Sequence, residues 1–211
     1  MITKEELQTP RTVEELSIYL DELFAEIRED QAARQAARAG KGLYKPLMEE
    51  LWPISWYFTR KYAGSFFRLK LELGNQGFDA VVLDEHACPV EWVEVSWPMD
   101  GHKHAGIVRL LNERGRGPIE VYDNPIEKLR EVFEFTIAGA QKKAIRDYNF
   151  KRPSTLALVV DLLPYYRADV PEHHRAVMQL IKRLSQLEYR VSKVVLLLAH
   201  SQEVFDVRSS R

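Results

Sequence analysis

Apolar positions near the N-terminus recur with the period of an α-helix. The segment 12–30, TVEELSIYLDELFAEIRED, opens with Thr12 and Glu15 at the spacing of a capping box. Its apolar face consists of Leu16, Leu20, Leu23, Phe24 and Ile27. This pattern predicts an amphipathic helix. The Ala/Arg-rich run 31–42 ends in two glycines, and we expect it to prolong this helix as an exposed basic arm before a flexible break.

The next part of the chain changes from a helical pattern to a strand pattern. A second helix is predicted over 44–62, and Pro53 is expected to kink it or to split it in two. Three strands are predicted after it, because 65–73 alternates, 78–84 is mostly apolar and 89–97 is rich in Val and Trp. Since only short turns separate them, we expect these strands to be neighbours in a meander.

The second half of the chain alternates helices with apolar strands. A short helix over 101–114 and a strand-like run at 119–123 precede a long helix over 125–149. The apolar stripe of the long helix consists of Leu129, Val132, Phe133, Ile137, Ala140, Ala144 and Tyr148. The remaining elements are expected to be a strand at 155–163, a helix at 171–189 and strands at 192–200 and 203–207. This order predicts an α/β fold with a mixed central sheet flanked by helices on both faces.

Composition limits the class of protein. A chain of 211 residues, 45% hydrophobic and 29% charged, can bury one substantial core, so we expect residues 1–211 to form a single domain. The formal charge of −1 gives no global basic field that would argue for nucleic acid. The single Cys88 excludes an internal disulfide, and the N-terminus lacks the apolar core of a signal peptide. No apolar run approaches the roughly 20 residues of a membrane helix. A cytoplasmic protein without a membrane partner is the expectation.

Two acids in the strand block carry the strongest chemical signal. In FDAVVLDEHACPVEWVEVSW, residues 78–97, Asp79 stands at the start of one strand and Glu94 lies inside the next. Burying a carboxylate among apolar residues is expensive unless a metal, a cation or a shared proton compensates. Strand periodicity places Glu94 and Ser96 on one face and Glu91 on the other.

The order of these elements resembles the core of the PD-(D/E)XK, or restriction-endonuclease-like, nuclease superfamily. The resemblance covers 44–162, with 1–42 as an N-terminal helical extension and 163–211 as an additional helix and strands. In that superfamily an Asp early in the second core strand and a Glu on the third hold Mg²⁺. These positions correspond to Asp79 and Glu94 in this chain.

The resemblance also implies a catalytic Lys two residues after the Glu, where this chain has Ser96. Some members of the superfamily supply that Lys from the following helix, and here the long helix contains Gln141, Lys142 and Lys143. At about 100° per residue, Lys142 lies nearly opposite the apolar stripe, whereas Gln141 and Lys143 flank it. Lys143 is therefore the better substitute, while the alternative is that all three are ordinary surface residues.

The implied cofactor is Mg²⁺ or Mn²⁺, because carboxylates are hard oxygen ligands suited to such ions. Glu72 on the preceding strand is a candidate third ligand, as are Glu49 and Glu50 on the second helix. For each of these three residues the alternative is an ordinary surface acid. The alternative for the main pair is structural. Asp79 could be a strand-start acid, and Glu94 could pair with an Arg or Lys on the sheet.

Basic residues after the third strand are candidate substrate contacts, because functional residues concentrate on loops beside a rigid sheet. They are His102, His104, Arg109, Arg114 and Arg116. Arginine forks could hold a phosphate backbone there. Asp100, His102 and His104 also have metal-ligand chemistry, but their spacing is not a specific zinc signature.

The leading hypothesis for function is a metal-dependent nuclease acting on DNA or RNA, with Asp79, Glu94 and Lys143 in the active site. One alternative is a catalytically inactive domain of the same fold that serves as a binding or scaffold module. Another is an α/β protein-interaction domain without phosphate chemistry, whose N-terminal helix docks a partner protein or a second copy in a homodimer.

Overall fold

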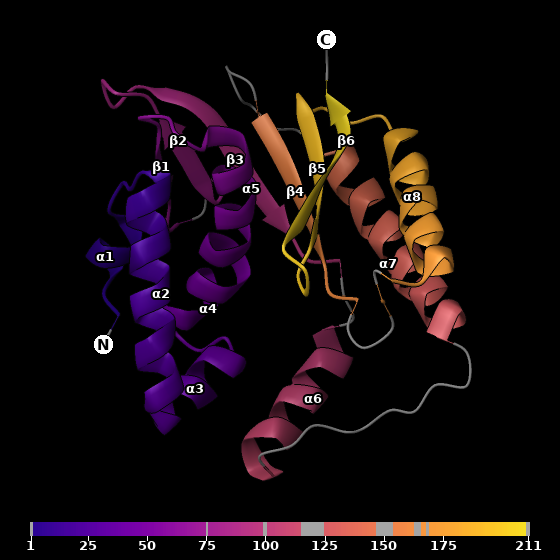
Figure 1. The fold of residues 1–211 in the computed structure, drawn as a ribbon, viewed down its shortest axis with the longest axis horizontal. Coiled ribbons are helices and arrows are strands. Elements are labelled where there is room, and N and C mark those ends of the chain that lie inside the picture. The colour runs from indigo at the N-terminus through magenta and orange to yellow at the C-terminus, as the bar shows by residue number, and fades with distance from the viewer. Residues whose placement is uncertain are drawn as a thin grey trace.

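A single six-stranded sheet organises the chain (Figure 1). The computed structural model describes residues 2–74, 76–98, 101–114, 125–146, 154–162, 166–167 and 169–209, with backbone alone at 101–105, 107, 154 and 209. The strands are β1 (Arg68–Leu71), β2 (Ala80–Leu83), β3 (Pro89–Ser96), β4 (Ser154–Val160), β5 (Lys193–Leu198) and β6 (Glu203–Ser209). They lie side by side in the order of the sequence.

The sheet is mixed, which confirms the predicted fold class. β1, β2 and β3 form an antiparallel meander, as the sequence predicts, while β3, β4 and β5 are parallel and β6 returns antiparallel to β5. Parallel neighbours need long crossovers, and helices provide them. α6 (Gly101–Arg114) and α7 (Pro125–Ala144) separate β3 from β4, and α8 (Pro171–Ser185) separates β4 from β5.

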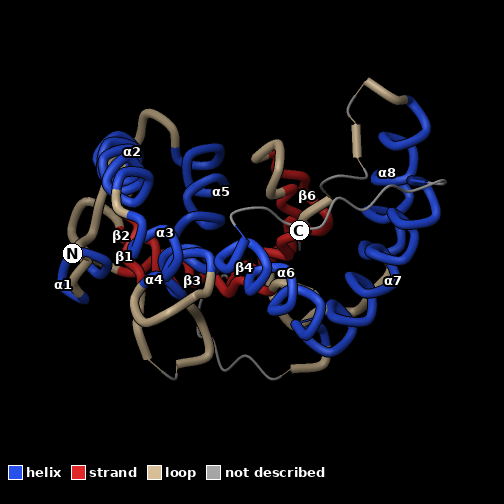
Figure 2. The backbone as a smooth tube through the Cα atoms, turned by 90° about the horizontal axis from the view of Figure 1, so that it is seen from below, coloured by secondary structure: helices blue, strands red, loops and turns tan. Residues whose placement is uncertain are grey.

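Alternation along the strands produces two hydrophobic clusters, one on each face of the sheet. On β4, Ala157 and Val159 pack with the N-terminal helices, while Leu156 and Leu158 pack with α7 and α8. Figure 2 shows α2 and α5 over one end of the sheet and α7 and α8 side by side at the other end. Helices therefore cover both faces, each over a different part of the sheet.

The N-terminal helices confirm the capping prediction and correct the prediction of one continuous helix. α1 (Lys4–Gln8) precedes α2 (Val13–Glu29), where the Thr12 hydroxyl accepts the Glu15 N–H and the Glu15 carboxylate accepts the Thr12 N–H. α2 ends at Glu29. Asp30 then caps the separate helix α3 (Gln31–Arg38), because its carboxylate accepts the N–H groups of Ala32 and Ala33.

The predicted disturbance at Pro53 takes the form of a π-helical turn. Helix α4 (Tyr44–Pro46) continues into a π-helix, η1 (Leu47–Leu51), and then into α5 (Trp52–Tyr62). Pro53 has no N–H, so it cannot donate to the Glu49 carbonyl four residues earlier. The Trp97 indole N–H donates to that carbonyl instead, over 2.7 Å. This contact ties η1 to the end of β3.

Other boundaries differ only modestly from the predicted ones. The long helix ends at Ala144 rather than at residue 149, and its predicted stripe is buried at Leu129, Phe133, Ile137, Ala140 and Ala144. The strand-like run at 119–123 lies outside the described residues. Within the described part of the chain, no helix is both long and apolar enough to cross a bilayer.

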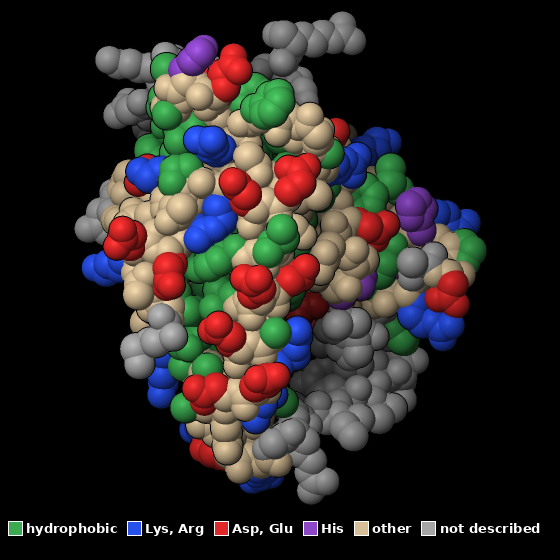
Figure 3. Space-filling model, turned by 60° about the vertical axis from the view of Figure 1, so that its left-hand side comes forward, with side chains coloured by type: hydrophobic (Ala, Val, Ile, Leu, Met, Phe, Trp, Pro, Cys, Tyr) green, Lys and Arg blue, Asp and Glu red, His purple; other side chains and the backbone are tan. Residues whose placement is uncertain are grey.

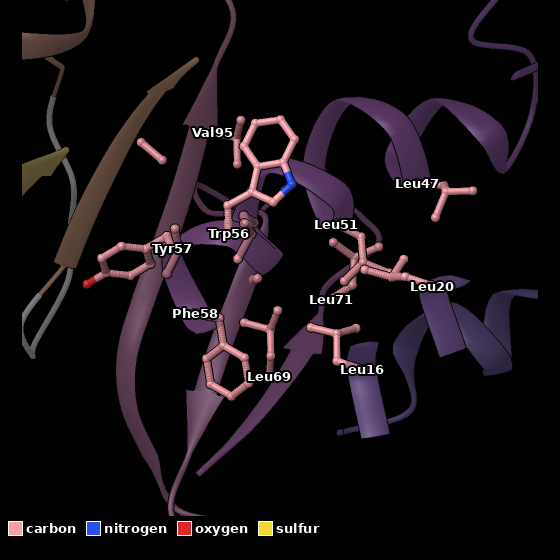
Figure 4. Packing of buried hydrophobic residues seen from close by; sticks show 14 of the residues in the cluster. Leu16, Leu20, Leu47, Leu51, Trp56, Tyr57, Phe58, Leu69, Leu71 and Val95 are labelled. Atoms are coloured by element: carbon pink, nitrogen blue, oxygen red, sulfur yellow. The ribbon is translucent and has the colours of Figure 1, made fainter. Parts of the chain in front are cut away.

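A buried carboxylate fixes α5 to the sheet. Glu91 on β3 is 3% exposed, and it accepts hydrogen bonds from Tyr57 and Tyr62, both at 2.7 Å, and from Thr155 on β4. Lys61 lies 3.0 Å from both of its oxygens. Figure 4 shows the Tyr57 ring turned away from the leucines of this core, toward β4. Burial alone would raise the pKa of Glu91, but the hydrogen bonds and Lys61 outweigh it and lower the pKa.

We predict that Glu91→Gln will destabilise the fold by about 2–4 kcal/mol, because a buried network loses its charge and an amide N–H meets existing donors. Urea denaturation at neutral pH measures this change. The matched control is Glu134→Gln, which breaks an exposed pair with Arg183 and should have a much smaller effect. Equal losses in the two variants would contradict a structural role for Glu91.

Candidate functional site

The second buried carboxylate of β3, Glu94, faces α7. Its neighbours along the strand, Val93 and Val95, belong to the cluster under α5, so alternation directs Glu94 to the other side of the sheet. Glu94 is 4% exposed. Its Oε1 atom lies 2.6 Å from Lys143 Nζ and 2.7 Å from Arg146 Nη1. Lys143, in the last turn of α7, and Arg146, in the turn that follows this helix, therefore both provide positive charge to one buried carboxylate.

Asp79 lies beside Glu94. Asp79 directly precedes β2, and its backbone N–H donates to the carbonyl of Val93, the residue before Glu94, over 2.9 Å. The Asp79 Oδ2 atom accepts the Val95 N–H over 2.7 Å. Burial raises the pKa of Asp79, the Val95 hydrogen bond opposes this rise, and the charge of Glu94 adds to it. The two acids of the sequence motif thus form one electrostatically coupled site.

Glu50 adds a third carboxylate from the opposite layer. It lies in η1, and π-helical turns are frequent at functional sites. Burial raises the pKa of Glu50 to about 7, and the charges of Asp79 and Glu49 contribute to the rise. The Trp97 contact at Glu49 holds this turn against the end of β3.

Glu72 is engaged differently. Its backbone N–H donates to the Asp79 carbonyl over 2.8 Å, so the two residues are neighbours along the main chain. Its carboxylate, however, lies 2.8 Å from Lys70 Nζ. The charge of Asp79 acts on Glu50, where it contributes to the raised pKa.

The three candidates on α7 separate as helical geometry predicts. Lys143 is partly buried and contacts Glu94, whereas Gln141 and Lys142 are exposed. Arg146 was not identified from the sequence. Its signal was the spacing of three residues from Lys143, which places both side chains on one face of a helix.

The candidate substrate residues are only partly described. Arg109 and Arg114 lie on α6 and are exposed, and Arg109 Nε is 4.0 Å from Glu113 of the same helix. The side chains of His102 and His104 are not described, and Arg116 lies outside the described residues. The described part of the chain therefore leaves these five residues as predictions.

The carboxylates of Asp79 and Glu94 are chemically suited to a hard divalent cation, but they do not supply a complete coordination shell. Glu94 Oε2 is buried and has no hydrogen-bond partner among the residues that the structure describes. Such an orphaned oxygen is costly unless a ligand compensates it. Among the described residues, no group of three or more His, Cys, Asp or Glu side chains is placed to hold a metal ion. Mg²⁺ usually needs only one or two carboxylates, with waters and substrate phosphates completing its shell. Asp79 and Glu94 are two carboxylates, which is the number of protein ligands that this smaller requirement calls for.

A close contact between α7 and the end of β3 sets the position of Lys143. A Cβ atom added to Gly139 would lie 2.5 Å from the Pro98 Cβ and 3.4 Å from the Pro98 Cα. The helix can therefore approach Pro98 this closely only with glycine at this position. Lys143 follows one helical turn later, where it reaches Glu94.

The fold and the site together define a mixed α/β protein in which a lysine from a crossover helix neutralises a carboxylate inside the third strand. Comparisons with known proteins do not assign this protein to a family. No protein-family model matches the chain, and a search of curated proteins finds no match. Among solved structures, Pyrococcus furiosus SfsA in complex with Ca²⁺ is similar with a TM-score of 0.27 and 10% identity, over 77% of this chain and 62% of that one. This chain thus matches less than two thirds of SfsA, and a likeness this distant carries no argument about function.

Substituting Gly139 should test the packing of α7. Gly→Ala inside a helix normally stabilises by about 1 kcal/mol. We predict that Gly139→Ala will instead lower the free energy of unfolding, because the new methyl group overlaps Pro98. Gly106→Ala in α6 is the control, since an added Cβ there meets nothing within 4 Å. Stabilisation by both substitutions in urea titrations would rule out the close contact.

Glu50 should make stability depend on pH. The unfolded chain loses this proton near its ordinary pKa of 4.5, whereas the folded protein keeps it until about 7. The wild-type protein should therefore lose stability as pH rises between these values, by no more than about 2 kcal/mol because the side chain is partly exposed.

Glu50→Gln should abolish this loss, so the variant gains stability relative to wild type at pH 8 but not at pH 4. Urea denaturation across this range provides the measurement. Glu22→Gln, which changes an exposed acid on α2, is the control. A pH profile that is the same in wild type and Glu50→Gln would exclude the shifted carboxyl.

Proposed function

We propose that this protein is a divalent-metal-dependent nuclease that hydrolyses phosphodiester bonds in DNA or RNA, as a divergent PD-(D/E)XK-like enzyme. The observation that carries the proposal is the state of Glu94. This carboxylate is buried within a strand and its charge acts on Asp79, one of its oxygens contacts a helix lysine, and the other has no hydrogen-bond partner among the described residues. A purely structural ion pair would not require the orphaned oxygen.

Each residue has a distinct role in this proposal. Asp79 and Glu94 would hold Mg²⁺ or Mn²⁺, and Glu50 could hold a water of its shell. Such an ion lowers the pKa of bound water and neutralises charge that develops on the phosphodiester. The motif position for lysine is occupied by Ser96, and Lys143 takes over the role of that lysine. Its ammonium group stabilises the same developing charge.

Surface charge favours one direction of substrate approach. Six acids and a single arginine lie on α2, and Figure 3 shows acidic side chains gathered over the face on which this helix lies. That face would repel a polyanion. Cations lie on other elements, with Arg34 and Arg38 on α3, Lys45 on α4 and Arg109 and Arg114 on α6. We therefore expect nucleic acid to approach from the side of α3, α4 and α6.

A second candidate function is a nuclease-like domain that binds nucleic acid or a partner without cleaving. Two observations favour it. Ser96 stands where the resemblance requires Lys, and Glu94 Oε1 already has two cationic partners. Such a protein would retain binding and lack hydrolysis.

Cleavage assays distinguish the two candidates. We predict that the full chain with Mn²⁺ or Mg²⁺ cleaves at least one member of a panel of single-stranded and double-stranded DNA and RNA, and that chelation stops the reaction. Asp79→Asn and Glu94→Gln should each lower the rate at least about a hundredfold, because the metal loses a ligand. Lys143→Met should lower kcat more than it changes KM.

The matched control for Glu94→Gln is Glu134→Gln, an exposed carboxylate on α7 that pairs with Arg183. Circular dichroism should show that every variant is folded. If the carboxylate variants cleave as fast as wild type, the proposed active site is wrong. If Lys142→Met rather than Lys143→Met abolishes cleavage, the role assigned to Lys143 is wrong.

A further inference from the structure

Two cations share one oxygen of Glu94. Lys143 Nζ lies 2.6 Å and Arg146 Nη1 lies 2.7 Å from Oε1, while Oε2 is buried and has no hydrogen-bond partner within the described part of the chain. The two cations differ in exposure, because 48% of the Arg146 side chain is accessible against 28% of the Lys143 side chain. Both reach an interior carboxylate from a surface where they can also meet a ligand.

The negative charge of Glu94 already has cationic partners without any metal ion. A buried carboxylate needs a counter-charge, and here Lys143 and Arg146 provide it. Both also lower the pKa of Asp79 and thereby favour its charged form, against burial and the charge of Glu94, which raise it. A divalent cation at Asp79 and Glu94 would be repelled by these two positive groups. The cations that stabilise the metal-free site therefore compete with a metal for the same carboxylate.

Phosphate is the ligand that would relieve this competition. Lysine binds phosphate as a point charge, and arginine binds it through a planar fork of donors. Arg146 lies two residues beyond the end of α7, in a turn where its backbone N–H donates to the Lys143 carbonyl over 3.1 Å, and both side chains reach the same oxygen of Glu94. One phosphate group in front of Glu94 could accept hydrogen bonds from both side chains.

We propose that Lys143 and Arg146 are exchangeable counter-ions of Glu94, which move from its carboxylate to a phosphodiester when nucleic acid binds. This inference rests on the proposed function and adds a regulatory property to it. Movement of the cations frees Glu94 Oε1 and removes positive charge from the metal site. Nucleic acid and the divalent cation then bind with positive cooperativity, and each ligand raises the affinity for the other by the same factor. Arg146 is thereby assigned as a phosphate-contacting residue.

Mn²⁺ binding tests this inference without reference to cleavage. We expect calorimetric titration of the full chain to show that a short phosphorothioate oligonucleotide raises Mn²⁺ affinity about tenfold, because it draws two charges away from the site. A methylphosphonate oligonucleotide of the same sequence has no backbone charge and should not raise the affinity. Equal effects of the two oligonucleotides would overturn the exchange of counter-ions.

Arg146→Met should raise Mn²⁺ affinity several-fold in the absence of oligonucleotide, because one competing cation is gone. The same substitution should reduce the enhancement that the oligonucleotide produces. Lys143→Met is a second variant with the same expected direction, and it provides the test if Arg146→Met does not fold. Arg175→Met on α8 removes an exposed partner of Glu172 and is the charge-matched control, with wild-type affinity expected. Lower or unchanged Mn²⁺ affinity in folded Arg146→Met and Lys143→Met would overturn the inference.

The cleavage and binding experiments fail in distinguishable ways. If Mn²⁺ binding is coupled to the charged oligonucleotide but no substrate is cleaved, the counter-ion exchange stands and the nuclease proposal fails. If cleavage depends on Asp79 and Glu94 while Mn²⁺ binding is independent of oligonucleotide, the nuclease proposal stands and the exchange is wrong. If wild-type protein binds no Mn²⁺ with or without oligonucleotide, both proposals are wrong.

Discussion

One strand carries two buried carboxylates that point to opposite faces of the sheet, and the helical layers are organised around them. Glu91 faces α5, and Glu94 faces α7. Each acid has to be neutralised where it lies, because a carboxylate in an apolar interior is otherwise unstable. Lys61 from α5 neutralises Glu91, while Lys143 and Arg146 from the end of α7 neutralise Glu94. β3 thus connects the two layers by charge as well as by hydrophobic packing.

The two acids differ in how many of their carboxylate oxygens have hydrogen-bond or ionic partners. This difference distinguishes a structural carboxylate from a candidate functional one. Both oxygens of Glu91 accept hydrogen bonds, from two tyrosines, a threonine and a lysine. Glu94 uses one oxygen for two cations, and its other oxygen is buried with no hydrogen-bond partner among the described side chains and backbone. A complete network fixes a helix, whereas an incomplete one retains the capacity to bind a ligand. Glu94 is therefore the functional candidate, together with Asp79 and Glu50, whose pKa values are raised.

The geometry around Glu94 depends on contacts that lie outside the site itself. The Trp97 indole replaces the N–H that Pro53 lacks and holds the π-helical turn that carries Glu50. The bare backbone of Gly139 lets α7 approach Pro98, one turn before Lys143. Trp97 and Pro98, which make these two contacts, directly follow β3 in the chain. The end of this strand therefore positions Glu50 from one helical layer and Lys143 from the other.

The sequence alone determined the class of fold, the meander of β1–β3 and the faces of β3, because hydrophobic periodicity reports which side of an element is buried. It also separated Lys143 from Lys142, since helical angle is a local property. Tertiary structure alone decided that the charge of Asp79 acts on Glu50, that the Glu72 carboxylate pairs with Lys70, and that Arg146 joins Lys143. It also decided that both oxygens of Glu91 are hydrogen-bonded, whereas one oxygen of Glu94 has no partner among the described residues. These contacts depend on how segments far apart in the sequence approach one another. Periodicity along a single helix or strand shows which of its sides is buried, but not which residue of another element lies against that side.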